Sequence, residues 1–416
     1  MASLLITNIK KLVNTRDRHH LLRGKELSDL PCIDNAYLII EDDTIAEFGS
    51  MSDLATQNLK LKTQNSFNAE GRLVLPAWCD SHTHIVFAAS RENEFIDKIK
   101  GLSYADIAAR GGGILNSAKK LQVTSEGELF RLAWQRLEEV SSLGTGAIEI
   151  KSGYGLTVES ELKMLRVIKK LKEKSSLQIK ATFLGAHTYP PEFKDNHQGY
   201  IDSIINEMLP VIAKDKLADY IDVFCETGFF SPEETTQIIN AGKKYGLKPK
   251  IHANQLSLSG GVETGVQLGA ISVDHLETMN EKTIAILAAS NTIGTLLPSA
   301  AFFLRMPFQP ARQLIDAGCA IALASDYNPG SSPSGNMNLV LSMSCIQMRM
   351  LPEEAINAAT INGAYAMELE NEVGTITAGK KANLIITKPV PSLAYLPYAF
   401  GSSLIDKVII AGKPTS

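Results

Sequence analysis

Cysteine is scarce in this sequence, and the few cysteines lie far apart. There are 5 of them in 416 residues, and none belongs to a C-x-x-C pair. Disulfide-stabilised secreted domains and cysteine-based zinc sites both depend on closely spaced cysteines. The spacing therefore excludes a disulfide framework and a structural zinc knuckle, and it favours a reducing compartment.

Long hydrophobic runs are also missing. No stretch reaches the roughly 20 apolar residues that cross a bilayer. The apolar run within residues 1–10 is too short for a secretory signal and has the pattern of a first β-strand. We therefore predict a cytoplasmic protein without a membrane partner.

Positive charge is not in excess. Lys and Arg total 41 against 45 Asp and Glu, which gives a net charge of -4. Proteins that bind nucleic acids need basic surfaces to neutralise phosphates, so we expect no nucleic-acid partner. Hydrophobic residues make up 44% and charged residues 21% of the chain, which is ordinary globular composition. The length predicts either several domains or one large barrel with additions.

Short apolar runs alternate with amphipathic segments through the middle of the chain. The segments Glu159–Lys174, Pro232–Tyr245 and Glu281–Ala289 have helical periodicity. Buried strands that alternate with helices indicate a parallel sheet, and eight strands indicate a (β/α)₈ barrel. A doubly wound open sheet is disfavoured because no G-x-G-x-x-G turn follows the first strand. The apolar runs cover residues 78–87, 147–151, 179–186, 220–225, 249–253, 271–275, 293–297 and 319–325.

Both ends of the chain have the pattern of short strands. We expect the C-terminal strands to complete a small β unit that begins at the N-terminus. The predicted strands are Leu4–Ile9, Ala36–Glu41, Ile45–Phe48, Asn383–Thr387 and Lys407–Ile410. The sequence thus predicts three parts, namely the N-terminal part of a β unit (residues 1–75), a catalytic barrel (76–370) and the C-terminal part of the β unit (371–416).

The sharpest local motif is the pair of histidines at positions 82 and 84. Residues i and i+2 of a strand point to the same face, so the imidazoles of His82 and His84 can converge on one ion. His252, His275 and Asp326 each end a later apolar run. All these residues fall at the C-terminal ends of the predicted strands, where barrels have their active sites. The pattern therefore predicts a metal site there.

These residues and several longer segments resemble the amidohydrolase superfamily, and within it the imidazolonepropionases. The resemblance runs nearly from end to end, and the segments 151–155 (Lys-Ser-Gly-Tyr-Gly) and 325–331 (Ser-Asp-Tyr-Asn-Pro-Gly-Ser) are its most specific parts. Imidazolonepropionases are hydrolases of histidine degradation that open the cyclic amide of 4-imidazolone-5-propanoate to N-formimidoyl-L-glutamate. The resemblance thus implies a small-molecule substrate.

The resemblance also implies the architecture and the cofactor. It implies a TIM-type metallohydrolase barrel with a small β-sandwich domain formed from both termini, and a homodimer. One Zn²⁺ or Fe³⁺ per subunit is expected on His82, His84, His252 and Asp326. Such an ion lowers the pKa of bound water towards ~7 and can supply hydroxide for attack on the ring carbonyl.

Two residues are expected to handle protons. Asp326 would bind the metal and accept a hydrogen bond from the water. His275 is expected to act as the base and then to protonate the departing ring nitrogen. Its alternative roles are a fourth metal ligand or an orienting residue.

Other residues are expected to bind the substrate. Arg91 offers a bidentate fork for the propanoate tail, whereas Tyr154 and His187 are expected to position the tail and the ring. The alternatives are a solvated arginine, a tyrosine that only caps its turn, and a histidine of the core. Further candidates are Asn328, Gly330 and Ser331, which follow Asp326 and would hold the amino-acid end of the substrate or product, and Tyr104, which is a candidate for reaching the pocket.

The residue type at position 255 distinguishes cyclic-amide hydrolysis from deamination. Many deaminases of the superfamily carry glutamate there, and an amide cannot exchange protons at neutral pH. Gln255 is therefore expected to hydrogen-bond the ring, while the proton transfers pass to His275 or Asp326. The alternative function, a related aminohydrolase that deaminates a heterocycle, is disfavoured because it would prefer glutamate at this position and has no clear need for Arg91. A binuclear cyclic amidase and a catalytically silent paralogue are further alternatives that the residues disfavour.

Overall fold

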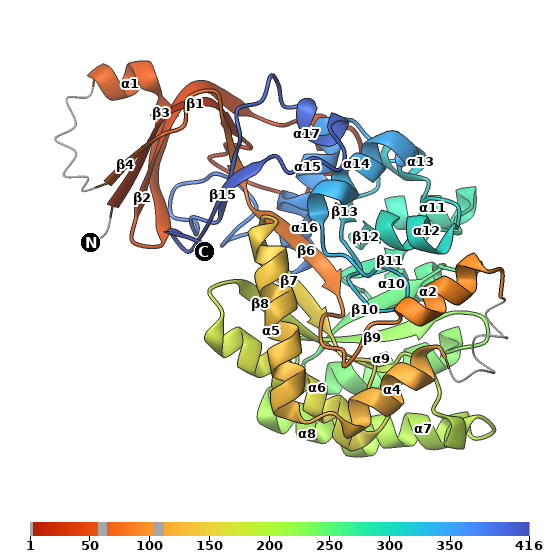
Figure 1. Ribbon diagram of the computed structural model, residues 1–416. Helices are drawn as coiled ribbons and strands as arrows, with labels where there is room; N and C mark the ends of the chain where they lie inside the picture. The colour runs from red at the N-terminus through yellow and green to blue at the C-terminus, as the bar shows by residue number, and fades with distance from the viewer. Residues whose placement is uncertain (1–2, 57–64, 103–111, 416) are drawn as a thin grey trace.

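Two sheets organise the chain. The computed structural model describes residues 3–56, 65–102 and 112–415. A barrel occupies the middle of the chain, and a second sheet, which holds strands from both ends, lies at one side of it (Figure 1). Among the described helices, none combines the length and the hydrophobicity needed to cross a bilayer.

The barrel contains eight parallel strands in chain order. The last strand reaches back to the first, because the His84 N–H donates to the carbonyl oxygen of Tyr327 at 2.9 Å and the Asp326 N–H donates to that of His82 at 3.0 Å. The predicted (β/α)₈ barrel is confirmed. Its strands are β6 (Trp78–Thr83), β7 (Thr145–Lys151), β8 (Gln178–Ala186), β9 (Tyr220–Cys225), β10 (Lys248–Ala253), β11 (Ser272–His275), β12 (Ile293–Leu296) and β13 (Ile321–Leu323).

Helices between the strands cover the barrel, and the three predicted helices are present (Figure 1). Ser231 begins α9 with a capping box: its side chain accepts the N–H of Glu234, and the Glu234 carboxylate accepts the N–H of Ser231. The helices around the barrel are α2 (Glu92–Ile99), α4 (Ile114–Val123), α5 (Glu126–Ser142), α6 (Val158–Lys174), α7 (His197–Ser203), α8 (Leu209–Asp215), α9 (Pro232–Lys244), α10 (Gly261–Gln267), α11 (Glu281–Ala288), α12 (Pro298–Leu304), α13 (Ala311–Asp316), α14 (Met337–Met348), α15 (Pro352–Ala359) and α16 (Ile361–Ala366). A π-helical segment, η3 (Ile204–Met208), joins α7 to α8, and η2 (Pro191–Phe193) is a short 3₁₀ turn.

The second sheet joins the two ends of the chain, as the sequence predicts. β14 pairs antiparallel with β5, so that a C-terminal strand lies beside an N-terminal one. Buried side chains of both ends, such as Ile6, Leu38 and Ile386, form a core of their own. The strands are β1 (Ser3–Val13), β2 (Cys32–Glu41), β3 (Thr44–Ser50), β4 (Asn65–Asn68), β5 (Leu73–Pro76), β14 (Leu384–Thr387), β15 (Ile405–Ile410) and β16 (Lys413–Pro414). The short helix α1 (Met51–Thr56) packs against β2 and β3, whereas α17 (Tyr395–Tyr398) packs against α14 of the barrel.

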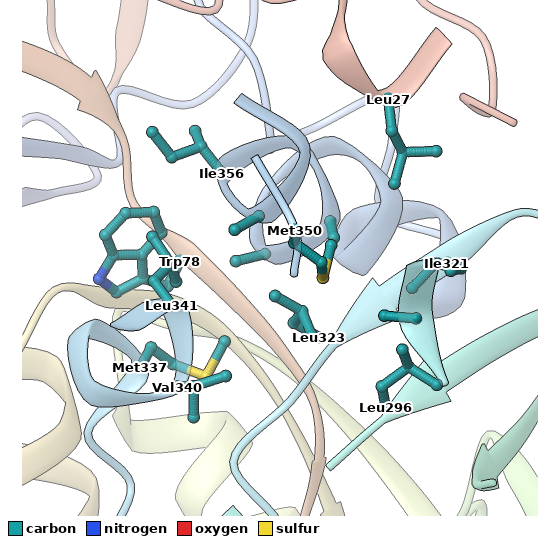
Figure 2. Close-up of a cluster of buried hydrophobic side chains, with 14 of the residues drawn as sticks. Leu27, Trp78, Leu296, Ile321, Leu323, Met337, Val340, Leu341, Met350 and Ile356 are labelled. Carbon is teal, nitrogen blue, oxygen red and sulfur yellow. The ribbon is translucent and has the colours of Figure 1, made fainter. Parts of the chain in front are cut away.

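A shared apolar core ties the N-terminal segment to the barrel. Between β1 and β2 the chain forms the 3₁₀ turn η1 (Gly24–Ser28), and Leu27 of this turn packs in the same cluster as Leu323 of β13 and Ile356 of α15 (Figure 2). The Asn362 side-chain N–H groups donate to the carbonyl oxygens of Leu22 and Ile321. The N-terminal segment therefore closes one side of the barrel through apolar packing and hydrogen bonds.

Glycine at position 363 lets α16 approach the first barrel strand, and this predicts a specific loss of stability. A Cβ atom there would lie 2.3 Å from the carbonyl oxygen of Cys79. We expect Gly363→Ala to lower the free energy of unfolding by about 1 to 3 kcal/mol, because the backbone must shift. Gly127→Ala is the control, since a Cβ there meets nothing within 4 Å. Thermal unfolding of the two variants tests this, and equal melting temperatures would contradict the packing.

Candidate metal centre and active site

Three buried histidines converge at the C-terminal mouth of the barrel. His82 lies on β6, His84 follows it, and His252 lies on β10. Their ligand atoms all lie within 4.8 Å of one another. The Nε2 atoms of His82 and His84 are 3.3 Å apart. The structure therefore brings together three of the predicted ligands from strands far apart in sequence.

The hydrogen bonding of these rings fits a bound cation. Neither ring nitrogen of His252 has a hydrogen-bond partner within the described residues, and Nδ1 of His84 has none either. Buried polar atoms in proteins are almost always satisfied. A cation between the rings would use the lone pairs that point into this space, and neutral imidazole is a common metal ligand. The donor set therefore fits a metal ion.

Asp326, the fourth predicted ligand, lies beside two of the histidines. Its Oδ1 atom is 3.6 Å from the Nε2 atoms of both His82 and His84. It is not one of the three residues that form the compact group. Burial raises the pKa of Asp326 to about 6, so a positive charge beside the carboxylate would favour its ionised form.

Two buried carboxylates stand behind the histidines. Asp274 Oδ2 is 2.7 Å from Nδ1 of His82. Asp222 Oδ2 is 2.9 Å from Nδ1 of His252, although the two groups are not aligned for a hydrogen bond. A carboxylate at Nδ1 leaves Nε2 for a metal and fixes the tilt of the ring.

Lys151 links these two carboxylates. Its Nζ atom is 2.9 Å from Asp222 Oδ2 and 3.5 Å from Asp274 Oδ2, and it donates to Glu149 Oε1 at 2.6 Å. Burial alone would lower the pKa of Lys151, but Asp222, Glu149 and Asp274 raise it above its ordinary value. Lys250 pairs with the other oxygen of Glu149. The barrel interior below the histidines is thus a layer of paired charges.

His275, which the sequence predicts to transfer protons, lies beside the histidine cluster. It ends β11, it is 3% exposed, and its ring centroid is 5.3 Å from that of His252. Its Nδ1 atom is 3.4 Å from Oε1 of Glu277, which also accepts the amide N–H of Gln309 at 3.0 Å. Burial would lower the pKa of His275, but the carboxylate of Glu277 raises it above its ordinary value. The carboxylate of Glu277 therefore orients the imidazole of His275.

Tyr154 and His187 close another side of the site. The Tyr154 ring lies 5.9 Å from the ring of His84 and 5.5 Å from that of His187, measured between centroids. The Nδ1–H of His187 donates to the carbonyl oxygen of Gly153 at 3.0 Å, which leaves Nε2 as an acceptor. Burial lowers the pKa of His187 to about 4. The carboxylate of Glu161 fixes this turn by accepting the N–H of Gly153.

The loop after Asp326 connects the metal-ligand cluster to Arg91. Asn328 donates to the carbonyl oxygen of Asp326 and to the hydroxyl of Ser331, both at 2.7 Å, and accepts the N–H of Gly330 at 2.8 Å. Arg91 lies against this loop, because a Cβ on Gly330 would be 2.3 Å from its Nη1 atom. The structure thus places Arg91 and the predicted loop residues together.

Gln255 and Tyr104 are the two remaining residues that the sequence predicts to bind the substrate. Gln255 is half-buried, and its carbonyl oxygen accepts the hydroxyl of Thr278 at 3.5 Å. Tyr104 lies outside the described residues.

Unusual backbone conformations mark the same edge of the barrel. Asn254, His275 and Asp326 have φ angles of 53°, 90° and 55°. Residues other than glycine rarely adopt positive φ, and such conformations gather at functional sites. The backbone therefore turns sharply where three strands deliver polar side chains to the site.

Sequence reasoning missed the residues that support the site. Asp222, Lys151 and Glu277 were assigned no role, although the first two are charged residues inside buried strands. A charge within a buried strand requires a partner, so alternation along β7 and β9 was the available signal. Glu277 carries no such signal, because it lies in a loop after β11.

Known proteins resemble this chain in sequence over nearly all of its length. The profile of the amidohydrolase family matches residues 73–415. A protein named imidazolonepropionase from Flavobacterium johnsoniae is 59% identical over 410 residues, which cover 98% of this chain and 99% of the relative. Its namesake from Thermoanaerobacter pseudethanolicus is 42% identical over 408 residues, or 98% of this chain and 96% of the relative.

Solved structures resemble it in fold. An adenosine deaminase from Xanthomonas campestris with bound zinc superimposes with a TM-score of 0.72 at 15% identity, and the match covers 99% of this chain and 92% of the other. An atrazine chlorohydrolase from Arthrobacter aurescens complexed with zinc gives a TM-score of 0.67 at 13% identity, over 99% and 94% of the two chains. At such identities the likeness establishes the fold alone.

The charged layer below the histidines predicts a large effect of removing Lys151. Lys151→Met would leave Asp222 and Asp274 buried without their shared cation, and breaking a buried pair typically costs about 3 to 5 kcal/mol. We expect the free energy of unfolding to fall by that amount in urea or thermal unfolding. Exposed Lys244 is the control. Lys244→Met should change the free energy of unfolding by less than about 0.5 kcal/mol. Equal stability of the two variants would show that Lys151 does not hold the layer together.

Proposed function

The chain belongs to the imidazolonepropionase family of amidohydrolases, and from this premise we propose that it hydrolyses 4-imidazolone-5-propanoate to N-formimidoyl-L-glutamate in histidine degradation. The observation that carries the proposal is the similarity to relatives of that name along nearly the whole chain. The cluster of His82, His84 and His252 at the barrel mouth supports a hydrolase that uses a metal.

We propose that one Zn²⁺ or Fe³⁺ per subunit binds His82, His84, His252 and Asp326. The unpartnered nitrogens of the imidazoles and the nearby Asp326 carboxylate support this set. When bound, such an ion polarises a carbonyl oxygen and lowers the pKa of water. Asp274 holds the ring of His82 through Nδ1 so that its Nε2 is available, and Asp222 lies 2.9 Å from Nδ1 of His252.

His275 is proposed to carry the proton. Its Nδ1–H donates to Glu277, so the lone pair of Nε2 is free to take a proton from the attacking water. The bond between the ring carbonyl carbon and the ring nitrogen then breaks, the carbon becomes a carboxylate, and His275 returns the proton to the nitrogen. Gln255 cannot exchange protons and is proposed to hydrogen-bond the ring.

Substrate positioning is proposed for the residues around this centre. Arg91 receives the propanoate carboxylate. Tyr154 and the Nε2 lone pair of His187 face the ring from the side of β7 and β8, which their contacts with His84 support. The loop residues Asn328, Gly330 and Ser331 are proposed to hold the amino-acid end of the substrate or product, and Tyr104 remains a proposed contact.

The setting of the enzyme is proposed as follows. All five cysteine thiols are free in the structure, which suits a cytoplasmic protein. We further propose a homodimer that acts on a small molecule.

We also propose that the chain divides into residues 1–75, 76–370 and 371–416. The end of β5 at Pro76 and the start of β6 at Trp78 support the first of these boundaries.

A direct assay tests the proposed reaction. Purified chain loaded with Zn²⁺ or Fe³⁺ is incubated with freshly prepared imidazolonepropanoate, and the loss of imidazolone absorbance is followed. We expect N-formimidoyl-L-glutamate as the product, identified by its mass. Absence of turnover by protein that carries one ion per chain would contradict the proposed substrate.

Metal content and turnover together separate the roles of two histidines. His252→Ala should lose the ion, because it removes a proposed ligand, and activity should fall with it. His275→Ala should keep a wild-type metal-to-protein ratio while kcat falls by about 100-fold or more, the usual contribution of a general base. Elemental analysis and initial rates measure both. Loss of the ion from His275→Ala would make this residue a ligand instead.

A further inference from the structure

Three charged side chains of α2 and its N-cap lie beside the loop after Asp326. Arg91 is the N-cap of α2, Glu94 lies in its first turn, and Lys98 lies in its last turn. The proposed function assigns the propanoate tail to Arg91 alone. The contacts of Arg91 show that its positive charge is already paired with a carboxylate.

Arg91 is already paired with a carboxylate. Its Nε and Nη2 atoms donate to Oε2 of Glu94 at 2.8 and 2.5 Å. The other oxygen of Glu94 accepts the N–H of Gly113 at 2.9 Å. The side chains of Arg91 and Glu94 are only 11% and 10% exposed. Glu94 thus holds the guanidinium by one edge.

This pairing divides the five N–H donors of the guanidinium. The edge formed by Nε and Nη2 is occupied by Glu94, whereas both N–H groups of Nη1 and the second N–H of Nη2 are left for a ligand. That free edge can still meet a carboxylate with two parallel hydrogen bonds. The pair has no net charge, however, because the carboxylate of Glu94 neutralises the guanidinium of Arg91. It therefore exerts little net attraction on an anion.

Lys98 supplies the missing charge. Its Nζ atom is 3.5 Å from the carbonyl oxygen of Gly330, the same glycine that Arg91 touches. Within the described part of the chain, no carboxylate oxygen lies within 4 Å of this Nζ atom. The side chain is partly buried, and its Nζ lies 5.8 Å from the centre of the Phe303 ring. Arg91, Glu94 and Lys98 together therefore carry a net charge of +1.

We propose that Lys98 is the second cation of the carboxylate-binding site and provides its net positive charge, while Arg91 provides the hydrogen-bonding geometry and Glu94 positions Arg91. The proposal rests on the proposed function, because the substrate of that reaction carries one carboxylate on its tail. A site with a charge of +1 matches such a tail, and it selects anionic substrates over uncharged imidazolones.

The surroundings of Lys98 support this assignment. Burial and the neighbouring positive charge of Arg91 lower the pKa of Lys98, and the carboxylate of Glu94 offsets only part of this effect. A carboxylate that arrives beside Gly330 would offset the repulsion between these two cations, because it lies near both. Binding of the tail therefore supplies the second negative charge that balances the two cations, one of which Glu94 already neutralises.

Kinetics of matched lysine variants in the metal-loaded full chain test the proposal. Lys98→Met should raise KM for imidazolonepropanoate about tenfold with kcat nearly unchanged, since it removes attraction present before and during the reaction. Lys98→Arg should restore most of the affinity, because it keeps the charge. Exposed Lys100, which ends the same helix, is the control, and Lys100→Met should leave KM unchanged.

Salt dependence gives a second readout that a merely structural role would not move. For the wild type, KM should rise when ionic strength increases from about 0.02 to 0.5 M, because salt screens charges. For Lys98→Met this rise should be clearly smaller. If Lys98→Met matches Lys100→Met in both KM and salt dependence while the wild type turns over, the proposal is overturned.

The proposal also has a test that does not need turnover. If the wild type fails to convert imidazolonepropanoate, the proposed function fails, and the carboxylate site is then probed by calorimetric titration with glutarate. Weaker glutarate binding by Lys98→Met than by Lys100→Met supports the role of Lys98. Equal binding by the two variants, or none by the wild type, overturns it.

Discussion

The pairing of charges inside the barrel is the constraint on which the rest of the structure depends. Barrel interiors are usually filled by branched apolar side chains, but here Lys151 lies fully buried among Glu149, Asp222 and Asp274. Each of these charges would be costly to bury alone. They are tolerable together because strands β7, β9 and β11 bring them within hydrogen-bonding distance or close to it, so the barrel and its charged layer depend on each other.

This layer connects the fold to the site. The same carboxylates that pair with Lys151 also meet the Nδ1 atoms of His82 and His252. The orientation of the histidines is therefore set from inside the barrel, and their outward nitrogens face one another at its mouth. Rigid strands position such groups more accurately than loops do, while the loops at the mouth carry the residues proposed to select the substrate.

Particular elements show how far the sequence could lead. Six of the barrel strands and the helices α6, α9 and α11 follow their predicted ranges closely, because runs of apolar residues and helical periodicity are local properties. The two strands that close the barrel are shorter than predicted, since β6 ends at Thr83 and β13 covers only Ile321–Leu323. The clustering of His82, His84 and His252 followed from their places at strand ends. The buried charges behind the histidines did not, since Asp274 meets His82 across 192 positions of the chain and Lys151 meets Asp222 across 71.

The sequence by itself determined the element order, the closed parallel barrel, the sheet built from both ends and the residue types at the barrel mouth. Each of these follows from hydrophobic periodicity and from the geometry of strands, which act over short distances along the chain. Only the tertiary structure decided which charges neutralise one another, such as Lys151 with Asp222 and Lys250 with Glu149. Electrostatic pairing depends on distances between side chains of different elements, and those distances exist only after the chain has folded.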